Sequence, residues 1–150
     1  GKGLLHVMHI SAKVKRTSRM HSISVLVNKH RPHCMSIAVG GTDEICFNNF
    51  RFLEKKWYHV VIVHEYHKLQ SSVASLFVNG QLRDDGKLKS GRQSSVMELL
   101  TSNSSADLTL FLGMPNNSNA ETPCVTEWFI KGVMIIEEPI VPDVIQSMYR

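Results

Sequence analysis

Residues 56–65 read KWYHVVIVHE and residues 74–80 read ASLFVNG. The first stretch is rich in Val and Ile and apolar on both faces in its middle, which is typical of a central strand buried in a sandwich. The second ends in Asn79-Gly80, a dipeptide that two-residue hairpin turns favour because both residues tolerate a positive φ. The strands expected in this region cover 57–66, 73–78 and 81–84.

Short β-like runs separated by turn residues continue outward on both sides. Ile23, Val25 and Val27 alternate with serines, as on a strand that is buried on one face. Helical periodicity is weak, except that Pro142 suits the first turn of a short terminal helix over 142–149. The remaining expected strands cover 4–11, 22–28, 35–39, 42–47, 108–112 and 128–136, and the expected loops cover 87–107 and 114–126.

Roughly nine strands at about ten-residue spacing predict an all-β fold, a two-sheet antiparallel jelly-roll sandwich with at most a short C-terminal helix. The chain has 150 residues, which fits one domain. It begins with Gly rather than Met, so we expect residues 1–150 to be a single domain excised from a much larger protein. No apolar stretch approaches the ~18 residues of a membrane span, and we expect no signal peptide.

The expected core follows from the strongest strands, because a sandwich buries the inner face of each sheet. Trp57 and Phe77 should supply large buried surfaces, worth about 3–5 kcal/mol each if truncated. The expected core residues are Val60, Ile62, Leu76, Val78, Leu110 and Leu112. The residues that we interpret as structural are Trp57, Phe77, Asn79, Gly80 and Trp128.

The two quoted stretches resemble the laminin-G and concanavalin A-like jelly-roll superfamily. With His64 after the apolar run, they resemble the concanavalin A-like domain of BEACH proteins, the beige and neurobeachin family. The resemblance covers about residues 20–150 and implies a binding module of a large cytosolic scaffold that acts in membrane traffic and protein sorting. The Asn-rich stretch 115–122 is compatible with a fungal beige homologue. Further matching motifs are Phe50-x-Phe52, Leu110-Phe111-Leu112-Gly113 and Trp128-Phe129-Ile130-Lys131-Gly132.

Charge is distributed unevenly along the chain. Residues 1–42 hold seven Lys and Arg and no Asp or Glu, a net charge of +7, whereas residues 43–150 hold ten basic and thirteen acidic residues, a net charge of −3. Such segregation suggests an anionic partner, although a solvated face with no partner gives the same pattern. The candidate residues for binding an anion or a partner are Lys13, Lys15, Arg16 and Arg19, in what we expect to be an exposed loop.

Catalytic and metal-binding patterns are absent from the sequence. Adjacent Glu137 and Glu138 would point to opposite faces of a strand, so they do not form the carboxylate pair of a glycosidase. His30-x-x-His33-Cys34 lacks the further ligands of a zinc site, and no loop concentrates the carboxylates that calcium favours. We therefore expect no enzyme activity, no cofactor and no metal. Three cysteines are too few for a disulfide framework, which favours a cytoplasmic location, with peripheral association on membranes as an option.

His59 and His64 are candidates for a concave binding face. Strand alternation places His59 with Val61 and Val63, and His64 with Val60 and Ile62, on opposite faces. The alternative is that at least one of them is a hydrogen-bonded core histidine.

Two classes of function are compatible with these features. The first is a scaffold module whose partners are other domains of the same chain, another protein or an anionic phospholipid surface. The alternative is a carbohydrate-binding lectin domain of the secretory route, which would stack sugars on exposed aromatic rings. Trp57 and Trp128 lie in core-like runs, which favours the first class. We expect no nucleic-acid binding, because the basic segment lacks interleaved aromatic residues.

Overall fold

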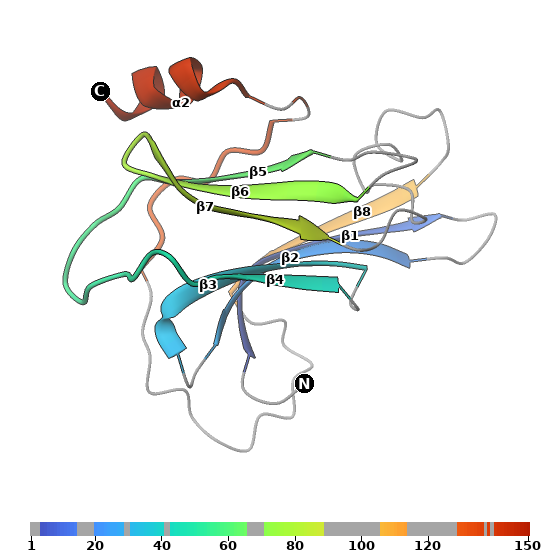
Figure 1. Cartoon of the computed structure of the whole chain (residues 1–150). Coiled ribbons are helices and arrows are strands. Elements are labelled where there is room, and N and C mark those ends of the chain that lie inside the picture. Colours follow the sequence, from blue (N-terminus) through green and yellow to red (C-terminus); the bar gives the residue numbers. More distant parts are fainter. Residues whose placement is uncertain are drawn as a thin grey trace.

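The computed structural model describes residues 4–14, 20–28, 31–40, 43–65, 71–88, 106–113, 129–136, 138 and 140–150. Its larger sheet has the strand order β4-β3-β2-β1-β8, its smaller sheet the order β5-β6-β7, and every paired neighbour is antiparallel (Figure 1). The expected all-β, two-sheet antiparallel sandwich with one short C-terminal helix is confirmed. The elements are β1 (Leu4–Val14), β2 (Met20–Asn28), β3 (Arg31–Val39), β4 (Asp43–Phe47), β5 (Val60–Glu65), β6 (Ser72–Val78), β7 (Gln81–Leu88), β8 (Ala106–Leu112) and α2 (Pro142–Tyr149).

The main core lies between the two sheets. Strand register aligns its residues in rows, because Ile10 pairs with Ile23 and Ile23 pairs with Val39 on the same inner face. Leu76 and Val78 of the smaller sheet are buried in this core, as expected. Val60 and Ile62 are half-buried and pack against it.

The helix α2 adds a third layer, over the outer face of the smaller sheet (Figure 1). Pro142 begins the helix, as the sequence predicts. Ile145 is fully buried in a second apolar cluster with Val63 and Phe77. The outer face of β5 is therefore covered as well as its inner face. This explains why KWYHVVIVHE is apolar on both faces although β5 is an edge strand and not the central strand that we expected.

The hairpin between β6 and β7 forms as predicted. Asn79 and Gly80 have φ values of 52° and 76°, which lie in the left-handed region that this turn requires. A Cβ atom at Gly80 would lie 3.2 Å from Cα of Gln146 and 3.3 Å from Cβ of Tyr149. The absence of a side chain at Gly80 therefore allows α2 to approach the turn closely.

Three expectations about burial and strands are wrong. Trp57 is 68% exposed, because it belongs to the loop before β5 and not to the strand. Leu110 and Leu112 are 44% and 52% exposed, because no described strand or helix covers the inner face of β8 completely. Residues 129–136 form no strand, although the sequence predicts one there. Phe77 is buried, as expected, and Trp128 lies outside the described residues.

Candidate functional site

Of the four candidate anion-binding residues, only Lys13 lies in the described part of the chain. Lys13 is exposed near the end of β1, where it pairs with Met20 of β2. Lys15, Arg16 and Arg19 lie outside the described residues. Their binding to an anionic surface stays a prediction.

His59 and His64 lie on opposite faces of the smaller sheet, so they do not form one site. The main chain of His59 is held by Asn79, which accepts from its N–H at 3.0 Å through Oδ1 and donates to its carbonyl at 2.8 Å. The His59 ring lies 6.0 Å from the ring of Tyr149 on α2. His64 faces the main core beside Ile62. Within the described residues, Nδ1 of His59 and Nε2 of His64 are buried without a hydrogen-bond partner.

Burial lowers the pKa of His64 below its ordinary value of about 6.5. The unfolded chain therefore binds a proton more readily than the folded protein, and stability present above about pH 6.5 is lost as the pH falls. We expect the melting temperature to drop between about pH 7.5 and pH 5.5, and His64→Gln to reduce that drop. Melting curves of both proteins across this range provide the measurement. An identical pH dependence in the variant would show that His64 does not contribute.

A further histidine pair on the outer face of the larger sheet was not recognised from the sequence. His6 and His9 are three residues apart, a spacing that places side chains on opposite faces of a regular strand. A bulge between His6 and Met8 brings both rings to one face, with their centroids 5.4 Å apart. His9 Nδ1 lies 2.7 Å from Ser24 Oγ across the β1–β2 pair. Burial, and then the neighbouring His9, lower the pKa of His6. The sequence analysis missed this pair because the bulge that brings the two rings together is not predicted by any local residue pattern.

The inner face of β8 is an apolar surface that the described elements leave open. Leu108, Leu110 and Leu112 pair with Ala12, Ile10 and Met8 of β1, so all three leucines face the same side as the main core. They are nevertheless 49%, 44% and 52% exposed. Ile10 and Ala12 on neighbouring β1 remain buried. The opening is therefore confined to the outermost strand of the larger sheet.

The unequal size of the two sheets causes this opening. A Cβ atom at Gly86 of β7 would lie only 3.0 Å from Cγ2 of Ile45 on β4, so β7 packs above β4. The larger sheet has five strands and the smaller sheet three, and β8, at the end of the larger sheet away from β4, is the strand whose inner face stays open.

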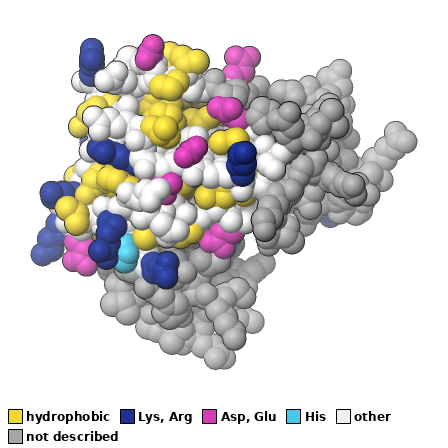
Figure 2. Space-filling model, viewed as in Figure 1, with side chains coloured by type: hydrophobic (Ala, Val, Ile, Leu, Met, Phe, Trp, Pro, Cys, Tyr) yellow, Lys and Arg dark blue, Asp and Glu magenta, His cyan; other side chains and the backbone are white. Residues whose placement is uncertain are grey.

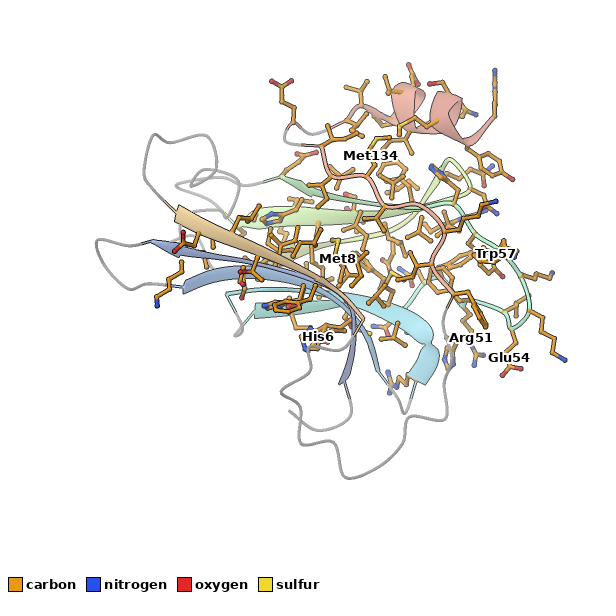
Figure 3. The ribbon with its side chains drawn as sticks, turned by 180° about the vertical axis from the view of Figure 1, so that it is seen from behind. His6, Met8, Arg51, Glu54, Trp57 and Met134 are labelled. Atoms are coloured by element: carbon orange, nitrogen blue, oxygen red, sulfur yellow. The ribbon has the colours of Figure 1, made fainter. Side chains whose placement is uncertain are left out.

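The segment 129–136 lies on this same side of the sandwich. In Figures 1 and 3 its trace runs past β5 toward α2, and Figure 3 shows Met8 between the sheets and Met134 on the helix side. Residues 129–136 form no strand and pair with none of the described strands. Phe129 and Met134 are 75% and 73% exposed. We define the open edge as the unpaired side of β5 together with Leu108, Leu110 and Leu112.

Metal-binding and membrane-spanning features do not appear in the described part of the chain. Its residues contain no group of three or more His, Cys, Asp or Glu that could hold a metal ion. Cys34 and Cys46 are both free, and Cys124 and His30 lie outside the described residues. No described helix has the length and apolarity that crossing a membrane requires.

The comparisons with known proteins give one partial relationship. No protein-family model matches the chain. The chain is 51% identical over 37 residues to the BEACH domain-containing protein lvsE of Dictyostelium discoideum, and the match covers 25% of this chain and 2% of that protein. This similarity supports the BEACH resemblance over one quarter of the chain.

A solved structure is similar to this chain at a low level. It is the crystal structure of an S-layer domain-containing protein from Clostridium thermocellum, with a TM-score of 0.40 and 16% sequence identity. The similarity covers 86% of this chain and 56% of that one.

Proposed function

We propose that this chain is a non-catalytic binding module of a large cytosolic scaffold protein that acts in membrane traffic and protein sorting. It binds an extended segment of protein, which adds as a β-strand at the open edge. The observation that carries this proposal is the half-exposed row of leucines on β8 at the end of the larger sheet, together with a β5 that pairs on one side only among the described strands.

The chemistry of the open edge favours a peptide strand as its ligand. Among the described residues β5 pairs only with β6, so its other side offers main-chain N–H and C=O groups. An added strand satisfies such groups, and its alternate side chains fit surface positions at a period of two residues. Leu108, Leu110 and Leu112 are spaced at this period, so they favour an apolar residue at every second position of the ligand.

A second copy of the chain does not fit as the source of this strand. If β5 of a second copy paired antiparallel with β5 in the same sheet plane, β8 of each copy would extend beneath the partner's smaller sheet. Both copies would then place their larger sheets in one layer, where the sheets would collide. A single strand from a different segment brings no second larger sheet with it.

The comparison with known proteins supports the cellular part of the proposal. The matched Dictyostelium protein is named for its BEACH domain, and the match occupies only 2% of its length. A protein of that size contains ample further chain from which a strand could be supplied. Cytosolic location, traffic and sorting are proposed on this similarity and on the sequence resemblance.

Selection from a displayed library of random peptides of about ten residues tests strand addition. We expect the selected peptides to alternate apolar and polar residues and to protect the amides of β5 from hydrogen exchange. Leu110→Lys with Leu112→Lys should weaken the binding of a selected peptide by about tenfold or more, because the inserted charges would be buried under the strand.

Phe111→Lys provides a matched control for this experiment. Phe111 is 40% exposed on the same strand but pairs with His9, so it faces away from the core. This variant should keep the peptide affinity. Peptides without alternation, or binding that is equally sensitive to the Phe111 change, would contradict strand addition.

A further inference from the structure

We propose that the loop before β5 docks on the surface of an anionic phospholipid membrane. The loop comprises residues 48–59, and its exposed tip is residues 51–57. It shares no residue with the open edge, so this inference stands or fails independently of strand addition.

The base of the loop is held firmly by aromatic packing. The rings of Phe50, Phe52 and Tyr58 pack edge to face, with centroids 5.0–5.8 Å apart. The Phe52 N–H donates to the carbonyl of His33 at 2.9 Å, and the Leu53 N–H donates to the Tyr58 hydroxyl at 3.1 Å. The tip is therefore presented from an ordered base.

The tip exposes apolar and basic side chains together. Leu53 is 57% exposed and Trp57 is 68% exposed, and Arg51, Lys55 and Lys56 are exposed between and beside them. Figure 3 shows Arg51, Glu54 and Trp57 at one end of the sandwich. Tryptophan rings favour the interface between membrane and water, and lysine and arginine are attracted to anionic headgroups. This combination matches the chemistry of an anionic bilayer surface.

Neighbouring elements extend the positive charge around the tip. Arg31 at the start of β3 and Arg83 on β7 are also exposed, and the Arg83 guanidinium lies 5.7 Å from the Phe50 ring. Figure 2 shows Lys and Arg side chains gathered at this end, with hydrophobic side chains among them. The acidic residues nearby are Glu54, Asp84 and Asp85; both carboxylate oxygens of Asp84 accept hydrogen bonds from Asn49. This end of the sandwich therefore holds five basic and three acidic residues.

The charge of this end favours a lipid surface over a sugar as the partner of Trp57. A sugar site pairs a stacked ring with acceptors for hydroxyl groups, whereas the tip places three cations and only Glu54 around Trp57. Trp57 is exposed and not buried as expected, so its ring is available to stack on a sugar. The surrounding cations nevertheless complement phosphate and carboxylate headgroups.

Lys13, the described basic residue of the segment identified from the sequence, lies at the opposite end of the sandwich. Arg31 pairs with Asn28, which pairs with Leu4, and Leu4 is nine residues from Lys13 along β1. At about 3.3 Å per residue, Lys13 lies about 30 Å from this end. Lys13 and the loop tip therefore cannot contact one flat membrane in the same orientation, and substitutions in the segment that begins at Lys13 serve as the control.

Fluorescence of Trp57 tests the inference directly. The chain has two Trp residues, so Trp128→Phe leaves Trp57 as the sole reporter. With vesicles of phosphatidylcholine and phosphatidylserine mixed at about three to one, we expect its emission to shift to shorter wavelength. With phosphatidylcholine alone, we expect no shift. No shift with the anionic vesicles at low salt, or an equal shift with both, would overturn the inference.

Vesicle co-sedimentation with charge variants locates the binding end. Combining Arg51→Ser, Lys55→Asn and Lys56→Ser should weaken binding by about a hundredfold at low salt, from roughly fivefold per charge. Asn is chosen at position 55 because Lys55 has a φ of 59°, which Asn tolerates. The control combines Lys13→Ser, Lys15→Ser, Arg16→Ser and Arg19→Ser and should retain binding within about threefold, although it removes more charge. An equal or greater loss in the control would overturn the assignment to this loop.

Discussion

Replacing Leu76 with Ala should lower the free energy of unfolding by about 2–5 kcal/mol, which is a large part of the stability of a domain of this size. Leu76 is fully buried in the main core, where it pairs with Ile62 of β5. Truncation removes apolar contacts and leaves a cavity beneath the smaller sheet. Denaturant unfolding followed by circular dichroism gives the measurement.

Leu110→Ala is the matched control, because it removes the same atoms from a residue that the sequence assigns equally to the core. Leu110 is 44% exposed, so we expect a loss of about 1 kcal/mol or less. Equal losses in the two variants would contradict the open inner face of β8. They would show instead that Leu110 is buried in solution.

Replacing Ile145 with Asp should detach α2 from the smaller sheet. Ile145 is fully buried against Val63 and Phe77, and a carboxylate there would have no partner in the second apolar cluster. The lost burial and the unpaired charge together should cost about 3 kcal/mol or more. An eight-residue helix is not stable alone in water, so the amides of 142–149 should lose their protection from hydrogen exchange.

Val144→Asp provides the comparison for this helix variant. Val144 is the preceding residue, is 44% exposed and lies in the first turn, where a carboxylate is favourable to the helix dipole. We expect its exchange protection to be unchanged. If both variants lost protection alike, the loss would come from adding a carboxylate to α2 and not from removing the buried contact of Ile145.

Local features of the chain were sufficient to predict most elements. Alternation predicted β2 and β3, Asn79-Gly80 predicted the hairpin, and Pro142 predicted the start of α2. Each of these signals depends on residues within one element or one turn. These signals indicate the sandwich class, but they do not predict how the two sheets overlap.

The candidate sites depended on longer-range features. His6 and His9 share a face only because of the β1 bulge, and Trp57 is exposed only because β5 begins after it. Lys13 proved to be exposed, as the sequence predicts, but the exposed basic and aromatic loop at the other end was not predicted. Of its residues, the sequence predicts only Trp57, Tyr58 and His59 to lie in a strand.

By itself, the sequence determined most of the segments that become strands and which face of each is apolar, because the period-two pattern is a property of the local backbone. Only the tertiary structure decided whether an apolar face is covered, because coverage depends on the strand or helix that lies opposite. Thus Leu76 and Leu110 carry the same local signal, yet one lies between two sheets and the other beyond the edge of the smaller sheet. The five-to-three mismatch between the sheets, which creates the open edge, arises from pairing between distant strands and is encoded in no single segment.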